Sequence, residues 1–155
     1  MKKLFILFVF FTGQLHAQNS NVSIVSGATS GGTWSPLLSS ATTQTTYTFT
    51  PNADNATVSA TELDELLRVK ISNVIIHTAC SGCTQPGQID FNTTLNSYNQ
   101  NSPTYNKTLT FNAASDVTIP NAISMRSTAT SNTNKGSLSL VINTSGNITV
   151  TADIS

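Results

Sequence analysis

The residues with the most distinctive chemistry are Cys80 and Cys83, the only cysteines of the 155-residue chain. In a chain that begins with an export signal, two cysteines this close predict a local disulfide that staples a turn. A redox role requires such a pair at the start of a helix, and the neighbouring Gly82, Pro86 and Gly87 indicate a turn instead. We therefore predict a structural disulfide between Cys80 and Cys83.

His77 lies three residues before Cys80, so the segment holds three candidate zinc ligands. A structural zinc site needs four, and Asp90 would complete the set only by chance. We predict no metal site and no cofactor. His77 is expected at the end of a strand, in a solvated or hydrogen-bonded turn, because a repeat places Asn112 at the equivalent position.

The densest acidic cluster comprises three residues: Glu62, Asp64 and Glu65. Ser59 precedes Glu62 by three positions, as in a capping box, and three leucines at helical spacing follow. The acids would then lie at the positive end of a short helix and Arg68 near its negative end. Because no partner base accompanies the cluster, we expect these carboxylates to be structural, and we predict no catalytic residue.

The elements that position these residues come from a sequence repeat. Within the final run, residues 138–155, residues 140–155 repeat residues 109–124 at an offset of 31 positions. Five apolar residues match in order: Leu140, Ile142, Ile148, Val150 and Ile154 fall on Leu109, Phe111, Val117, Ile119 and Ile123. Each copy contains a strand, a turn that begins with Asn112 or Asn143, and a second strand.

An earlier copy of the repeat can be aligned with these two. Val74 and Ile76 match the first strand, and Ile89, Phe91 and Leu95 match the second. Its turn is seven residues longer than the others, and the extra residues include both cysteines. The sequence therefore predicts three coils in register, the first with a disulfide-containing insertion.

Matched coils put like residues above one another. Ile89, Val117 and Ile148 would form one inward column, whereas Asn112 and Asn143 would form an amide ladder in the turn. Coils that each bury a thin apolar strip become stable only by stacking. We predict an all-β fold, a right-handed parallel β-helix (solenoid) with one short N-terminal capping or spacer helix. An antiparallel β-sandwich is the alternative, since short strands and turns also suit it.

The N-terminus predicts export. Lys2 and Lys3 precede the apolar run Leu4 to Phe11, and Ala17 provides a small residue for cleavage. The run is too short to span a bilayer, so we expect a signal peptide at residues 1–17 and no integral membrane segment. Residues 18–45 are expected to be a polar lead-in in which Trp34 caps the core, and residues 46–155 are expected to form the coils.

Charge excludes one class of partner. Without Lys2 and Lys3 the chain keeps five of its seven basic residues against seven acidic ones, a net charge of −2. No basic stripe is visible, so we expect no nucleic acid partner. Ser, Thr and Asn fill the polar positions, as is typical of extracellular β-structure.

The pattern resembles the β-helical repeats of bacterial filamentous-haemagglutinin-like exoproteins and large secreted adhesins. The segments that carry the resemblance span roughly residues 46–155, above all 116–124 and 146–155. The resemblance implies a right-handed parallel β-helix exported for surface attachment, and it implies no catalytic or ligand residue. The last coil would be left uncovered after Ile154, so we expect a fragment followed by further coils of the same longer chain.

Segments 96–107 and 125–137 vary between coils and are rich in Asn, Ser and Thr. Such insertions emerge on one side of a solenoid and often carry recognition. We therefore predict a secreted or cell-surface adhesin that binds a host or cell-surface glycan or protein through its loops, without catalysis. The alternative is a fragment of a β-helical polysaccharide-active enzyme, but Asp90, Asp116 and Asp153 fall in three different columns.

Overall fold

The computed structural model describes residues 18–40, 45–70, 72–96, 107–124 and 138–154. The expected signal peptide and most of both variable segments lie outside the described residues. Within the described ranges, no helix is both long and apolar enough to cross a membrane.

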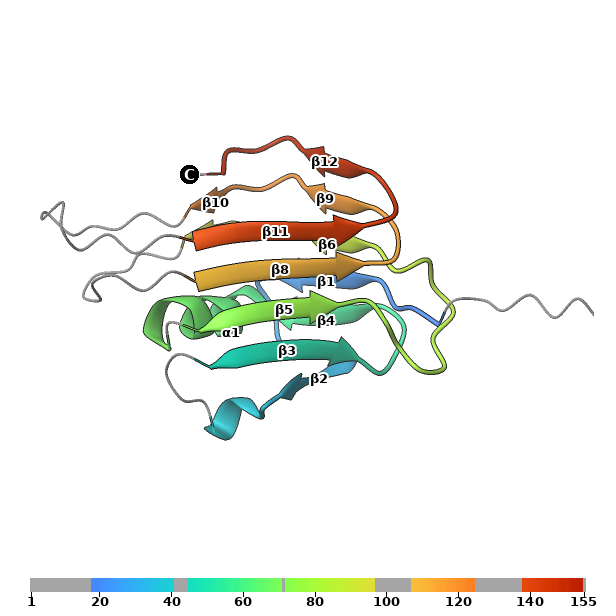
Figure 1. The fold of residues 1–155 in the computed structure, drawn as a ribbon, viewed down its shortest axis with the longest axis horizontal. Helices are drawn as coiled ribbons and strands as arrows, with labels where there is room; N and C mark the ends of the chain where they lie inside the picture. The colour runs from blue at the N-terminus through green and yellow to red at the C-terminus, as the bar shows by residue number, and fades with distance from the viewer. Residues whose placement is uncertain (1–17, 41–44, 71, 97–106, 125–137, 155) are drawn as a thin grey trace, which may run out of the picture.

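The first sheet contains five strands that lie above one another from the bottom to the top of Figure 1. In spatial order they are β2 (Gly32–Ser35), β3 (Thr46–Pro51), β5 (Asn73–His77), β8 (Lys107–Ala113) and β11 (Leu138–Thr144). All neighbours pair in parallel except β2, which runs antiparallel to β3. β2 therefore closes one end of this sheet with a different strand geometry.

The second sheet faces the first and is parallel throughout. Its five strands are, in spatial order, β4 (Ala56–Ser59), β1 (Val22–Val25), β6 (Ile89–Phe91), β9 (Val117–Ile119) and β12 (Ile148–Val150). A third, two-stranded ladder pairs β7 (Leu95–Asn96) with β10 (Ile123–Ser124), and Ile154 extends it by one bridge.

These sheets form a parallel β-solenoid, as the repeat predicted. In Figure 1 the strands β5, β8 and β11 run to the right in front, and β9 and β12 run to the left behind them. The chain rises from β3 to β11 as it winds, which is a right-handed coil. Parallel pairing between successive coils excludes the antiparallel sandwich.

The predicted register is confirmed at each anchor. Leu140 pairs with Leu109 and Ile148 with Val117, and Ile123 pairs with Leu95 on one side and Ile154 on the other. The inward side chains of the middle coils form the core. Ile89, Phe91, Leu109, Phe111, Val117 and Ile119 are each 0% exposed.

The helix begins where it was expected, but its cap differs. α1 (Ala60–Asp64) continues into a π-helical turn, η2 (Glu65–Val69), and Leu63, Leu66 and Leu67 are buried. Ser59 is the N-cap residue but makes no side-chain cap hydrogen bond, so the predicted capping box is wrong. Thr29 replaces Glu62 as the acceptor for the Ser59 amide. The Thr29 Oγ1 atom accepts from this amide at 2.8 Å and donates to Glu62 at 2.6 Å.

Residues 18–45 were expected to be a polar lead-in, but β1 in this segment belongs to the second sheet. β1 is hydrogen-bonded between β4 and β6, so it is an interior strand of the second sheet. Val22 and Ile24 point into the core and are fully buried. The first sheet has no equivalent strand, since β3 and β5 are direct neighbours there. The N-terminal segment is therefore threaded into the stack, and only the part from β2 to the 3-10 turn η1 (Leu38–Ser40) acts as a cap.

Candidate functional site

The cysteine-containing turn, residues 78–88, encloses the start of the described chain, and we call it the collar. Cys80 and Cys83 form a disulfide with their Cα atoms 5.5 Å apart, and each is 4% exposed. The Ser20 amide donates to Thr78 O, and the Cys80 amide donates to Gln18 O. The longer turn therefore has a structural reason: it must pass around the segment that leads into β1 (Figure 1).

Asn21 and Gly87 hold the collar in place. The Asn21 Oδ1 atom accepts from the amides of Gly87 and Gln88 at 3.2 and 3.0 Å. Gly87 has φ +84°, and an added Cβ would lie 2.8 Å from the Asn19 Cβ. Only glycine combines this backbone conformation with so close an approach. The collar is therefore held tightly against the start of the described chain, and both of its cysteines are buried.

His77 belongs to a ladder of side chains at the ends of three successive strands. Asn143 donates to Asn112 at 2.8 Å, and the Asn112 amide lies 3.3 Å from His77 Nδ1. The amide nitrogen can only donate, so this contact requires an unprotonated Nδ1. The predicted Asn ladder is confirmed, with His77 as its third member. Among the described residues, no group of three His, Cys, Asp or Glu could hold a metal ion.

The acidic side chains serve the fold at several separate places. Glu62 accepts hydrogen bonds from Thr29 and from Trp34 Nε1, and Asp64 pairs with Arg68 at 2.9 Å. Asp54 accepts from the amide and hydroxyl of Thr84 in the collar, and Asp116 accepts from the Asn147 amide. These carboxylates bind backbone and side-chain donors at different corners of the stack. They do not converge on one point where a substrate bond could be cleaved.

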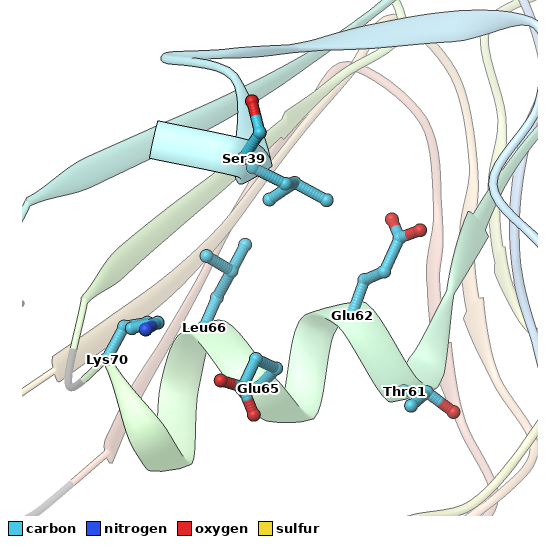
Figure 2. Close-up of a pocket in the computed structure, with 7 residues that line it drawn as sticks. Ser39, Thr61, Glu62, Glu65, Leu66 and Lys70 are labelled. Carbon is cyan, nitrogen blue, oxygen red and sulfur yellow. The ribbon is translucent and has the colours of Figure 1, made fainter. Parts of the chain in front are cut away.

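A crevice of about 470 Å³ lies between η1 and the helix (Figure 2). Leu38 and Leu66 give it an apolar part, and Glu62, Glu65 and Lys70 give it charged groups. In Figure 2, Glu62 and Leu66 rise from the helix toward the segment that carries Ser39. Because Glu62 already accepts two hydrogen bonds, its carboxylate positions Trp34 and Thr29. We assign the crevice to the packing of the cap.

The outer face of the first sheet is a regular surface over four strands, and we call it the polar face. It consists of the outward side chains of four strands: Thr46, Thr48 and Thr50; Asn73, Ile75 and His77; Thr108, Thr110 and Asn112; Ser139, Val141 and Asn143. Strand pairing aligns them in columns, for example Thr48, Ile75, Thr110 and Val141. The face carries no Asp, Glu, Lys or Arg. Nine of its twelve side chains carry hydroxyl or amide groups, and the other three are Ile75, His77 and Val141.

Lys107 lies at the start of β8 and points inward. It is 5% exposed, and its Nζ donates to Leu67 O at the end of the helix. Burial lowers the pKa of Lys107 below its usual value, although the nearby Asp64 carboxylate acts in the opposite direction. No pattern in the sequence indicates a role for Lys107, because it lies at the end of a polar variable segment.

Comparison with protein-family models, with curated proteins and with solved structures gave no match. The resemblance to adhesin repeats therefore stays a prediction from the sequence.

Proposed function

We propose that the chain is an exported, non-catalytic, adhesin-like protein that binds a surface glycan or protein without altering it. The observation that carries this proposal is the polar face. An array made mostly of hydroxyl and amide groups, with no Asp, Glu, Lys or Arg, can exchange hydrogen bonds with a hydroxyl-rich partner over four strands at once. A charged polymer would find no complementary charge there.

The polar face favours an uncharged glycan over a charged one. The columns of the stack place donors and acceptors at the strand spacing of about 4.8 Å. Asn112 and Asn143 bond to each other along their column, which fixes their amide orientation before any partner arrives. Such fixed groups lose little side-chain entropy on binding. The variable segments 96–107 and 125–137 are rich in Asn, Ser and Thr, which is the same hydrogen-bonding chemistry.

The proposal is tested by binding and turnover on one panel of polysaccharides. The purified protein is mixed with neutral and acidic polysaccharides, and both co-sedimentation and the release of new chain ends are measured. We expect binding to neutral polymers and no new ends. Release of ends would support the polysaccharide-active alternative, and binding to protein targets alone would move the partner to the protein class.

A matched pair of variants locates the surface. Thr110→Lys places a charge in the centre of the polar face, and we expect glycan affinity to fall at least about tenfold through desolvation of that charge. Thr118→Lys places the same charge on the outside of the second sheet, beside Asp90, and should leave affinity unchanged. Equal loss in both variants, or in neither, would show that the polar face is not the binding surface.

A further inference from the structure

One column of the polar face carries a chain of hydrogen bonds with a fixed direction. His77, Asn112 and Asn143 pair in register near the ends of β5, β8 and β11, which run side by side in Figure 1. Asn143 Nδ2 donates to Asn112 Oδ1 at 2.8 Å, and Asn112 Nδ2 lies 3.3 Å from His77 Nδ1. Each amide therefore donates toward the preceding coil. We call these three residues the directed ladder.

His77 determines the direction of the directed ladder. A side-chain amide always carries both a donor and an acceptor, so a pair of amides alone can point either way. A neutral imidazole that accepts at Nδ1 requires Asn112 to present its nitrogen to the ring. The Asn112 oxygen then faces Asn143, which must present its own nitrogen in turn. The exposed Asn143 keeps its oxygen as an acceptor for a partner.

Protonation of His77 reverses these requirements. The imidazolium carries a proton on both nitrogens, so Nδ1 becomes a donor and faces the donor Asn112 Nδ2. A half-turn of the Asn112 amide brings its oxygen to the ring, and Asn143 must turn as well because two nitrogens would otherwise face each other. The outer end of the directed ladder then offers an NH₂ group where it offered an oxygen, and the polar face gains a positive charge.

We propose that His77 is the specificity-determining residue of the polar face and selects the class of glycan by its protonation. With His77 neutral, the face is uncharged and the directed ladder ends in an acceptor, which suits the hydroxyl groups of a neutral glycan. With His77 protonated, the positive charge and the outward donor suit the carboxylates of an acidic glycan. The choice of partner rests on the proposed function, whereas the reversal of the directed ladder does not.

The elements beside His77 hold few other titratable groups, and none belongs to the polar face. The outward side chains of β3 and β8 are threonines and Asn112. The titratable residues of β3, β8 and the collar are buried, and the two cysteines are joined in the disulfide: Tyr47, Lys107, Cys80 and Cys83. The turns after β3 and β8 hold Asp54 and Asp116, whose carboxylates accept hydrogen bonds from Thr84 and Asn147.

The sequence makes this titration easy to assign. Histidine is the side chain whose charge ordinarily changes between about pH 5 and pH 8. His77 is the only histidine of residues 18–155, since the other one, His16, lies in the predicted signal peptide. Within the polar face, protonation in this range therefore occurs at His77 alone.

The first experiment follows the directed ladder itself, without any glycan. Imidazole and side-chain amide signals of the isotope-labelled protein are recorded by NMR from about pH 8 to about pH 5. We expect the amides of Asn112 and Asn143 to shift with the same midpoint as the His77 ring. The amide of Asn21, which binds the collar, should stay constant. Constant Asn112 and Asn143 amides, or a ring that does not titrate in this range, would overturn the proposal.

A matched variant separates His77 from every other titrating group. His77→Gln keeps an acceptor at the end of the directed ladder but cannot be protonated in this range. The amides of Asn112 and Asn143 should then give the same signals at every pH. Circular dichroism checks that the variant folds. Shifts in this variant that equal those of the wild type would assign the reversal to another group and overturn the role of His77.

The second experiment measures the selection of the partner. Wild type and His77→Gln are titrated with neutral galactomannan and with acidic polygalacturonate at both ends of the pH range and at constant ionic strength. We expect the affinity of wild type for polygalacturonate to be about tenfold higher at the acidic end, and that of His77→Gln to be unchanged. Equal pH dependence in both proteins would overturn the selection by His77.

The two proposals fail in distinguishable ways. Reversal of the directed ladder without binding to either polymer would overturn the proposed function together with the selection of the partner. Binding of galactomannan by wild type, with no gain for polygalacturonate on acidification, would support the proposed function and overturn the role of His77 alone.

Discussion

The two ends of this solenoid are built from similar apolar columns and finished in opposite ways. At the closed end Trp34 packs edge to face on Phe49, with ring centroids 5.4 Å apart, and its Nε1 donates to Glu62. At the other end of the described stack, formed by β11, β12 and Ile154, Ile148 and Val150 have no comparable cover among the described residues, and we call it the open end. The difference shows how much of the burial at the closed end comes from the dedicated cap.

The closed end is completed by residues far apart in the sequence. Thr29, Trp34 and Glu62 come from three elements and form one hydrogen-bonded group over the helix start. β1 and the collar add a second layer of closure, because the collar binds the segment that feeds β1. At the closed end single residues therefore link several elements, and its stability should depend on them.

Removing the cap should have the largest effect. Trp34→Ala deletes a buried ring, leaves the Phe49 ring without its aromatic partner and leaves the Glu62 carboxylate with the Thr29 hydrogen bond alone. We expect a loss of about 3–5 kcal/mol in the free energy of unfolding, measured by urea denaturation. Trp34→Phe keeps the ring and loses only the hydrogen bond, so it should cost about 1 kcal/mol. If Trp34→Ala costs no more than Trp34→Phe, the ring does not cap the core.

The column of Ile89, Val117 and Ile148 allows the same truncation of isoleucine to alanine to be made in a buried and in an exposed environment. Ile89→Ala should cost about 2–5 kcal/mol because Ile89 is 0% exposed. Ile148→Ala removes the same atoms from a side chain that is 52% exposed, and in dilute solution it should cost less than about 1 kcal/mol. Both variants are compared by urea denaturation. Similar losses in the free energy of unfolding would mean that Ile148 is covered as well as Ile89 is.

Removing the disulfide measures how much the collar contributes to stability. The double variant Cys80→Ser with Cys83→Ser should lose about 2 kcal/mol, since a disulfide with a sequence separation of 3 closes a small loop. Hydrogen exchange should then increase at Ser20 and Val22, whose amides donate to Thr78 O and Gln88 O. Unchanged exchange at these two amides would show that the hydrogen bonds hold the collar without the disulfide.

The smallest effect is expected at Lys107, which pairs in register with Leu138 of the last coil. The lowered pKa of Lys107 means that, between this value and the usual 10.5, the unfolded chain binds more protons than the folded one. The free energy of unfolding should therefore rise with pH over that interval and stay flat below it. Lys107→Met should abolish the rise in urea denaturation at alkaline pH. A rise that persists in the variant would assign it to another group.

The coils could be predicted because their information is local and repeated. An offset of 31 residues aligned Leu109 with Leu140 and Asn112 with Asn143, and the structure pairs both. The long turn before Ile89 was visible as an insertion, and its two cysteines are joined. Equivalent residues in a parallel stack experience the same environment, so their types repeat and the register can be recognised.

The position of β1 could not be predicted, because it has no counterpart in the repeat. Val22 and Ile24 provide only two inward residues, and nothing in their own segment indicates a place between β4 and β6. The capping box failed for a related reason. Ser59 and Glu62 have the expected spacing, but Thr29, thirty residues earlier, bonds the Ser59 amide in place of the Glu62 carboxylate. Tertiary partners of this kind are not encoded in local spacing.

Hydrogen exchange of the β11 and β12 amides tests the difference between the two ends most directly. The amides of β11 and β12 that face away from β8 and β9 should exchange quickly, because no strand pairs with that edge in the described part of the chain. The amides of β3 and β5, which lie between paired strands, should be protected. Protection of the outer β11 and β12 amides as strong as that of β3 and β5 would contradict the account that only one end is closed.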